Sequence, residues 1–204
     1  MDRSEFFGRI FRGSKGLIEI RCLPSGSQRF TRDFGEIEKV IGENRRENIF
    51  FGATTRNGQG GSKNHAFEVV SLWADLDFKE FIEGERMARR AIDAFPLKPS
   101  IIVNSGHGYH VYWLLTKPVR ATLDIESYLK GIARALDGDR AAAEIARILR
   151  VPETINRKKN LPPVQARVVA ANDYRYKLVQ FRPWKTPKIF WRTLIQDSQT
   201  RSQK

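Results

Sequence analysis

The chain has 204 residues, of which 41% are hydrophobic and 29% charged, and its formal net charge is +13. This length suits one folded unit, and no apolar run approaches the roughly 20 residues that a membrane helix needs, so we expect no membrane contact. The single cysteine, Cys22, excludes an intramolecular disulfide and a zinc site built from several thiolates. The excess of Lys and Arg favours a polyanion such as nucleic acid as the partner. Residues 1–7 lack the layout of a secretory signal, which indicates a cytoplasmic protein.

Strands and helices alternate in the N-terminal part, although residues 1–16 carry no clear pattern. The spacing of apolar residues predicts a strand at 16–23, a helix at 33–43 and a strand at 48–55. A glycine-rich segment follows at 56–63. It either approaches a phosphate through its backbone N–H groups, with Arg56 and Lys63 adding charge, or it is a plain connector.

Residues 71–79 carry the pattern on which the functional interpretation depends. Apolar and polar side chains alternate there, which predicts a strand with one apolar face and with Asp75 and Asp77 on the other. Residues i and i+2 of a strand lie roughly 6 to 7 Å apart, so the two carboxylates can converge on a shared metal ion. This strand is therefore a candidate active centre.

A hairpin is predicted beside this strand. Strand-like runs at 100–104 and 109–115 are joined by the tight loop Ser105-Gly-His-Gly108. In the second run, His110 lies on the face opposite Trp113. We therefore expect His110 on the face that carries the two aspartates.

The remaining patterns are mostly helical. A helix is predicted at 81–95, and it would cover the sheet with Ile82, Met87, Ala91 and Ile92. Asp139 is most simply the N-cap of a helix at 140–149. The other predicted elements are a helix at 124–136, a basic loop at 150–160, a strand at 163–170 and a frayed end from 195. We expect a catalytic unit of two lobes at 1–185 and a polar tail at 186–204.

Three carboxylates, a neighbouring histidine and several basic loops suit phosphoryl transfer with two divalent ions. Five short motifs follow one another in the chain: Gly60-Gly-Ser-Lys63, Trp73-Ala-Asp-Leu-Asp77, Ser105-Gly-His-Gly-Tyr-His110, Gly138-Asp139 and Arg150-Val-Pro-Glu-Thr-Ile-Asn-Arg-Lys158. In this combination the sequence resembles the archaeo-eukaryotic primase superfamily, and within it the primase-polymerase domains of phages, plasmids and other mobile elements.

The resemblance implies a role for each matching residue. Asp75, Asp77 and Asp139 would bind two Mg²⁺ or Mn²⁺ ions, and His110 would join them as a catalytic residue that contacts the incoming nucleotide. The residues implied in nucleotide binding are Ser105, His107, Arg150, Asn156, Lys158 and Lys63. For the loop at 150–158, a solvated basic surface without a ligand is the alternative. The resemblance thus gives Asp139 a metal role in place of a purely structural one, and this role is compatible with its capping the helix.

The resemblance also implies a fold and an activity. The fold would be α+β, a primase palm with an RRM-like mixed sheet beside a smaller N-terminal αβ lobe. The activity would be that of a DNA primase, a nucleotidyltransferase that copies single-stranded DNA into short primers from ribo- or deoxyribonucleoside triphosphates. Such an enzyme could also extend primers as a DNA polymerase and work with a replicative helicase.

Two residues depart from the family pattern. His107 stands where relatives often have Arg or Lys, so phosphate binding there would be weaker or dependent on pH, because histidine is charged only in mild acid. Glu153 stands where the family usually has Gly after Pro152. If that Gly serves a positive φ, a side chain there reshapes the loop.

Two other functions are alternatives to primer synthesis. A histidine-metal nickase of the replication-initiator type needs histidines at i and i+2, whereas His107 and His110 lie at i and i+3. A nucleic-acid-binding protein without catalysis would leave the convergence of Asp75, Asp77 and Asp139 without a purpose.

Overall fold

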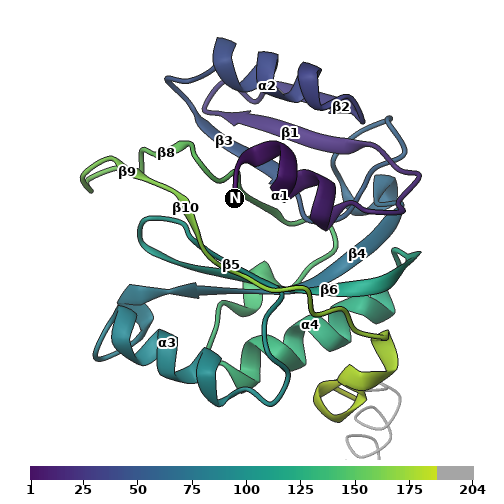
Figure 1. The fold of residues 1–204 in the computed structure, drawn as a ribbon, viewed down its shortest axis with the longest axis vertical. Helices are drawn as coiled ribbons and strands as arrows, with labels where there is room; N and C mark the ends of the chain where they lie inside the picture. The colour runs from purple at the N-terminus through teal and green to yellow at the C-terminus, as the bar shows by residue number, and fades with distance from the viewer. Residues whose placement is uncertain (188–204) are drawn as a thin grey trace, which may run out of the picture.

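The computed structural model describes residues 1–187, which form two four-stranded sheets and a two-stranded ribbon (Figure 1). The predicted tail at 186–204 therefore lies almost wholly outside the described residues. No helix in residues 1–187 combines the length and the hydrophobicity that a membrane span requires. Helices and antiparallel sheets occur in one chain, which confirms the predicted α+β class.

The N-terminal sheet has the strand order β2-β1-β3-β7 and is antiparallel throughout. Helix α2 covers one side of it, and α1 lies between this sheet and the other one (Figure 1). The element bounds are α1 Arg3–Ile10, β1 Ile18–Leu23, β2 Gln28–Thr31, α2 Phe34–Glu43, β3 Asn48–Gly52 and β7 Ile148–Arg150. Sequence patterns missed α1 and β2, and they predicted helix where β7 forms.

The central sheet has the strand order β10-β5-β6-β4, and α3 and α4 cover one of its faces (Figure 1). Its elements run strand, helix, strand, strand, helix, strand, which is a common α+β arrangement. All three ladders are antiparallel, which differs from the mixed sheet that we expected. The element bounds are β4 Glu68–Asp77, α3 Glu85–Ala94, β5 Ile101–Asn104, β6 Gly108–Arg120, α4 Leu123–Ala135 and β10 Arg167–Ala171.

Short elements complete the described chain. The two-stranded ribbon pairs β8 with β9, and β8 contacts β3 of the N-terminal sheet. The bounds are β8 Ile155–Asn156 and β9 Val164–Gln165, with 3₁₀ turns η1 at Lys63–His65, η2 at Phe78–Glu80, η3 at Arg140–Ala142 and η4 at Leu178–Trp184.

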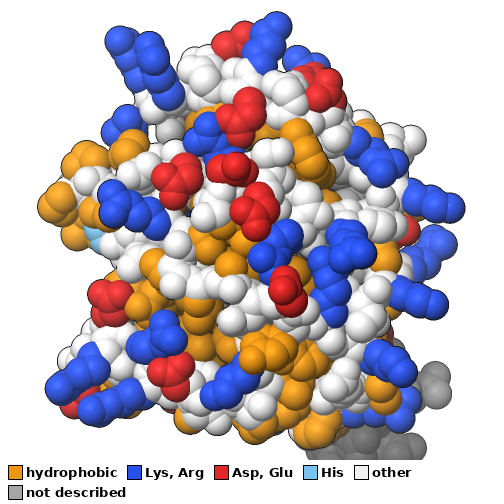
Figure 2. All heavy atoms as spheres, in the orientation of Figure 1, with side chains coloured by type: hydrophobic (Ala, Val, Ile, Leu, Met, Phe, Trp, Pro, Cys, Tyr) orange, Lys and Arg blue, Asp and Glu red, His pale blue; other side chains and the backbone are white. Residues whose placement is uncertain are grey.

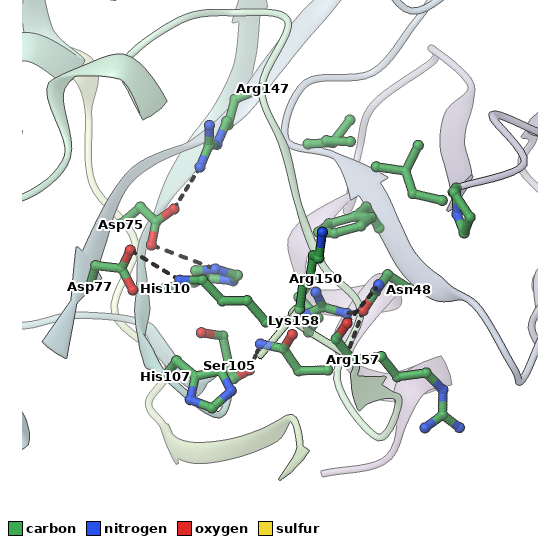
Figure 3. Close-up of a pocket in the computed structure, with 16 residues that line it drawn as sticks. Asn48, Asp75, Asp77, Ser105, His107, His110, Arg147, Arg150, Arg157 and Lys158 are labelled. Atoms are coloured by element: carbon green, nitrogen blue, oxygen red, sulfur yellow. Dashed lines mark hydrogen bonds and ion pairs between the residues drawn. The ribbon is translucent and has the colours of Figure 1, made fainter. Parts of the chain in front are cut away.

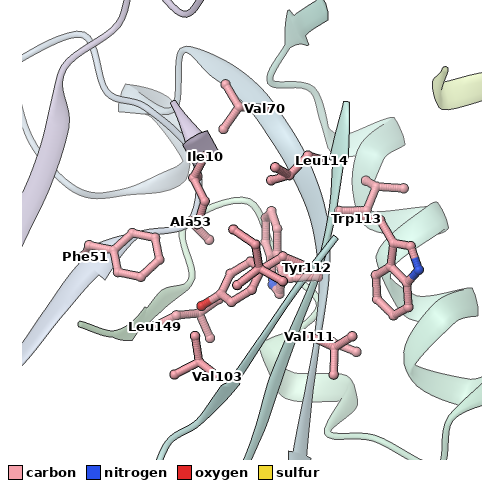
Figure 4. Packing of buried hydrophobic residues seen from close by; sticks show 14 of the residues in the cluster. Ile10, Phe51, Ala53, Val70, Val103, Val111, Tyr112, Trp113, Leu114 and Leu149 are labelled. Carbon is pink, nitrogen blue, oxygen red and sulfur yellow. The ribbon is translucent and has the colours of Figure 1, made fainter. Parts of the chain in front are cut away.

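The central sheet is buried on both faces. On the helix side, Trp113 contacts Phe95 and Phe181, with ring centroids 5.2 and 6.4 Å apart. On the other side, Tyr112 contacts Phe6 of α1, which in turn contacts Phe51 of β3 at 5.5 Å. Figure 4 shows Tyr112 on the side of Phe51, with Trp113 on the opposite side of β6. This packing confirms the predicted division of β6 into two faces. It also shows that α1 joins the two sheets through aromatic contacts, each worth of order 1 kcal/mol beyond simple burial.

The predicted helix at 81–95 begins late, at Glu85. The 3₁₀ turn η2 precedes it, and Gly84 has a φ of +58°, which an α-helix cannot include. The expectation that Ile82 and Met87 cover the sheet is wrong, since Ile82 is 98% exposed and Met87 38%. Ile92 is buried as expected, and it is joined by Ala88.

The predicted helix at 140–149 is also wrong, for a reason that lies outside the segment. The buried side chain of Arg56 donates to the carbonyls of Ile145 and Ala146, at 3.1 and 3.0 Å. The amide of Ala53 donates to the carbonyl of Arg147. These carbonyls therefore have partners in the segment just after β3. The run forms only short turns: a 3₁₀ turn capped by Asp139 through the amide of Ala141 at 2.8 Å, and a turn in which the amide of Arg147 donates to the carbonyl of Glu144 at 3.0 Å.

Glu153 occupies a backbone conformation that favours glycine, with a φ of +58°. The family that the sequence resembles usually has Gly at this position, and here Glu takes the glycine-like conformation. We expect Glu153→Gly to have a higher free energy of unfolding than Glu153→Ala by about 1 kcal/mol, because only Ala keeps the steric cost. Both variants lose the hydrogen bond from Gln165 to Glu153, so the pair is matched. Urea denaturation measures the difference, and equal stabilities would contradict the assignment of strain.

Candidate active site

A cavity of about 660 Å³ opens between the central sheet and the N-terminal sheet (Figure 3). Carboxylates and histidines of the central sheet and its β5–β6 loop form one wall, and basic side chains from β7 and the segment after it form another. The lining residues are Leu23, Pro24, Asn48, Phe50, Asp75, Asp77, Ser105, His107, His110, Arg147, Ile148, Arg150, Asn156, Arg157, Lys158 and Lys159. This cavity is where the predicted site residues gather.

The two aspartates of the first motif lie at the end of β4, and Asp139 is tied to them through the backbone. The amide of Asp139 donates to the carbonyl of Asp75 at 2.8 Å. A Cβ on Gly138 would lie 2.9 Å from that carbonyl oxygen, so the glycine permits the approach. Asp139 lines a neighbouring cavity of about 520 Å³, and Asp77 lines both cavities. The three carboxylates are therefore close in space although Asp139 is distant in sequence.

Arg147 lies between two of these carboxylates. Its Nη2 is 2.7 Å from Oδ2 of Asp75 (Figure 3). The same atom is 3.9 Å from Oδ2 of Asp139. Its Nε is buried and has no hydrogen-bond partner among the described residues. Sequence reasoning missed this residue because the run at 140–149 was interpreted as a helix.

His110 lies opposite Asp75 in the ladder of β4 and β6 and is buried, at 6% exposure. Its Nε2 is 3.7 Å from Oδ1 of Asp75, and its Nδ1 has no partner among the described residues. Burial lowers the pKa of His110 below its usual value of 6.5, and Arg147 and Arg150 lower it further, against the opposite effect of Asp75. The imidazole is therefore mostly neutral at pH 7.

The loop from Ser105 to Gly108 is held by its own hydrogen bonds and by Asn156. The hydroxyl of Ser105 donates to the carbonyl of Gly108 at 3.0 Å, and Nδ2 of Asn156 donates to the carbonyl of Ser105 at 2.7 Å. The other amide atom, Oδ1 of Asn156, is buried without a partner among the described residues, as is Nε2 of His107. Unpaired polar atoms in a cavity are costly unless a polar ligand or water meets them.

Arg150 is fixed in the basic wall. Its guanidinium donates to Oδ1 of Asn48 at 3.0 Å and lies 4.5 Å from the ring centre of Phe50. Burial lowers its pKa to about 10, so it stays charged at neutral pH. It has no carboxylate partner in the described part of the chain. Nζ of Lys158 lies 3.6 Å from Oδ2 of Asp77.

Two residues expected near a phosphate lie elsewhere. Nζ of Lys63 is 2.7 Å from Oε1 of Glu126 and 3.3 Å from Oε2 of Glu144, and Lys63 does not line the cavity. The phosphate role suggested for Arg56 is wrong, because Arg56 is fully buried and paired with Glu19 at 2.8 Å. The predicted site residues that do line the cavity are Asp75, Asp77, Ser105, His107, His110, Arg150, Asn156 and Lys158.

Asn48 and Phe50 were missed by sequence reasoning. Both lie on β3, and their side chains hold or face Arg150. The only signal for Phe50 was its place in an alternating strand, which does not distinguish a cavity from solvent. The family motif contains neither residue.

The donor set can be compared with the needs of a divalent ion. Among residues 1–187, no group of three or more His, Cys, Asp or Glu side chains is arranged to hold a metal ion. The carboxylate oxygens of Asp75, Asp77 and Asp139 nevertheless suit a hard cation such as Mg²⁺ or Mn²⁺. The guanidinium of Arg147 already places a positive charge between two of them. The carboxylates therefore fit a divalent cation by their donor chemistry, and Arg147 supplies a positive charge beside two of them.

Basic side chains are not confined to the cavity. Figure 2 shows Lys and Arg spread over the visible face, with Asp and Glu interspersed among them. The net positive charge therefore does not mark a single nucleic-acid surface on this face. The cavity is better defined by its lining than by the overall charge.

No protein-family model matches the chain, and no curated protein matches it. Solved structures do match. The AEP domain of the cyanophage S-2L primase-polymerase has a TM-score of 0.68 at 13% identity, covering 90% of this chain and 98% of that one. The primase RepB′ has a TM-score of 0.54 at 12% identity, covering 98% of this chain and 66% of that one. The catalytic domain of RepB′ in complex with initiator DNA has a TM-score of 0.53 at 14% identity, covering both chains completely.

These likenesses establish the fold of the chain, which is that of primase catalytic domains. The resemblance to the archaeo-eukaryotic primase superfamily, inferred from short motifs, is thereby confirmed at the level of the fold. At 12 to 14% identity the comparisons do not assign an activity or the roles of particular residues.

Gly108 lies opposite Asp77 in the ladder, and its lack of a side chain allows β6 to approach β4 there. A Cβ at this position would lie 2.5 Å from the carbonyl oxygen of Leu76. We expect Gly108→Ala to lower the free energy of unfolding by about 1 to 3 kcal/mol, because backbone atoms must move. The control is Gly42→Ala in α2, where the added Cβ would have no atom within 4 Å. This substitution should raise the free energy of unfolding by up to about 1 kcal/mol. Urea denaturation of both variants tests this, and a neutral Gly108→Ala would refute the close approach.

Proposed function

We propose that the chain is a primase-type nucleotidyltransferase that copies single-stranded DNA into short primers. The observation that carries the proposal is one cavity with Asp75, Asp77 and His110 on one wall and Arg150 and Lys158 on another. The third carboxylate, Asp139, is held against Asp75. The fold of the primase neighbours supports the same reaction class.

The basic wall suits the triphosphate of a nucleotide. Arg150 keeps its charge at neutral pH and is oriented by Asn48, so it presents a fixed cation to the cavity. A guanidinium held in this way binds phosphate oxygens well because its N–H groups form a rigid fork. Lys158, His107 and the loop at Ser105 would contact the remaining phosphate oxygens.

His110 would contact the nucleotide as a neutral imidazole. Its free Nδ1 and the nearby carboxylate of Asp75 leave it one hydrogen bond to give or to receive in the cavity. Asp75, Asp77 and Asp139 would hold Mg²⁺ or Mn²⁺. Such ions, when bound, stabilise the charge on the attacking and leaving oxygens in phosphoryl transfer.

The apolar side of the cavity suits a nucleobase. Leu23, Pro24 and Phe50 lie there, on the N-terminal sheet and the turn after β1. Aromatic side chains in nucleic-acid sites stack on bases without regard to sequence. The partners in this proposal are single-stranded DNA, nucleoside triphosphates and, in replication of a mobile element, a helicase.

The carboxylates supply the decisive test of catalysis. Asp75→Asn with Asp77→Asn should reduce primer synthesis by at least about 10²-fold, because removing a group that stabilises the transition state commonly costs that much. Asp93→Asn, an exposed aspartate on α3, is the control and should retain activity. The assay uses a single-stranded template, Mg²⁺ or Mn²⁺, and labelled ribo- and deoxyribonucleotides in parallel. Equal products from the wild type and the double variant would disprove the assigned site, and no product from the wild type would favour a protein that only binds DNA.

Phe50 tests the nucleobase side of the cavity. Phe50→Leu should weaken binding of nucleotide or template about 10-fold, since stacking on an aromatic ring is worth about 1 to 3 kcal/mol per base. Phe50→Tyr keeps the ring and should bind as the wild type does. Fluorescence anisotropy with a labelled single-stranded oligonucleotide and with a labelled nucleotide measures both variants. Equal affinities for Leu and Tyr would show that no base stacks on this residue.

A further inference from the structure

Arg147 has no role in the function proposed so far, although it touches the centre of the site. Its Nη2 donates to Oδ2 of Asp75 at 2.7 Å and lies 3.9 Å from Oδ2 of Asp139. Its side chain is 29% exposed and also lines the main cavity. The guanidinium thus contacts two proposed metal ligands and the space proposed for the nucleotide.

This position conflicts with a metal ion on the same carboxylates. The hydrogen bond from Arg147 occupies Oδ2 of Asp75, one of the two oxygens with which this carboxylate can bind an ion, and a guanidinium repels a divalent cation at this range. The guanidinium of Arg147 and a metal ion therefore compete for the carboxylate of Asp75. Either the arginine moves when the ion binds, or the ion binds weakly.

The backbone of Arg147 is held by several hydrogen bonds, whereas its side chain is held by few. The carbonyl of Arg147 accepts from Ala53, and the two preceding carbonyls accept from Arg56. By contrast, the guanidinium makes one short contact, and its Nε has no partner among the described residues. A change of rotamer can therefore carry the guanidinium from Asp75 into the cavity without disturbing the fold.

We propose that Arg147 is a positioning residue that substitutes for the metal ion. In the metal-free protein it holds Asp75 and Asp139 together, and when the ion binds, its guanidinium turns into the cavity and binds a phosphate oxygen of the nucleotide. The proposal rests on the proposed function, because it takes Asp75 and Asp139 as metal ligands. An ion that binds Asp75 releases the guanidinium for the phosphate, and a nucleotide that binds the guanidinium releases Asp75 for the ion. Each ligand therefore strengthens the binding of the other, and this coupling is reciprocal.

The test measures Mn²⁺ binding to the nucleotide-free protein by the electron paramagnetic resonance of the free ion. Arg147→Met removes the charge and keeps an unbranched side chain. We expect it to bind Mn²⁺ about 10-fold more tightly than the wild type and a non-hydrolysable nucleoside triphosphate about 10-fold more weakly, within the usual range of coupling between sites. A role in stability alone would not tighten metal binding.

Three variants separate the explanations. Arg140→Met removes the same charge next to Asp139 from a side chain that is not in contact with Asp75 in the described structure, so equal tightening would reveal a general field effect and overturn the proposal. Arg147→Gln is measured in parallel in case the Met variant does not fold. With Asp75→Asn, loss of Mn²⁺ binding places the ion at this site.

The outcomes distinguish the inference from the proposed function. If Asp75→Asn abolishes Mn²⁺ binding but neither Arg147 variant tightens it, the inference fails and the proposed metal site stands. If Mn²⁺ binding does not depend on Asp75, the proposed metal site fails, and the inference fails with it.

Discussion

Arg56 and Glu19 form an ion pair that is wholly withdrawn from solvent, and the backbone beside the carboxylates depends on it. A buried charge is tolerated only when its hydrogen-bonding groups are satisfied. Here Arg56 also donates to Thr54 and to the carbonyls of Ile145 and Ala146. These contacts fix the turn at residues 144–147, directly before β7. Because Arg147 is the last residue of this turn, the same contacts bring its side chain to Asp75.

The site therefore belongs to both sheets. The central sheet supplies Asp75, Asp77 and His110 on strands that are paired along most of their length, which makes their spacing rigid. The chain that leaves the N-terminal sheet at β7 supplies Arg150 and Lys158. Negative and positive side chains thus reach the cavity from different sheets. Helix α1 packs between the two sheets, and its Phe6 contacts both of them.

Local patterns in the sequence were sufficient for the central sheet and insufficient for the contacts between sheets. Alternation along β4 and β6 placed Asp75, Asp77 and His110 correctly, because one-residue steps in a strand fix the face of each side chain. The same rules gave a helix at 140–149, since the carbonyl acceptors that Arg56 satisfies are some 90 residues away from it in the chain. The structure of α1 was missed because its signal is a single turn of apolar residues. Arg147 was missed because a helix was predicted for its segment. Lys63 was assigned to the nucleotide site from its motif alone.

The hydrogen bond from Asn156 to Ser105 links the loop after β7 to the loop of the hairpin, and Asn48 similarly holds both Arg150 and the backbone of Arg157. Both loops border the cavity. Their conformational freedom is therefore lost when the protein folds and not when a ligand arrives. A ligand that enters meets groups already preorganised, so more of the interaction energy is available for affinity.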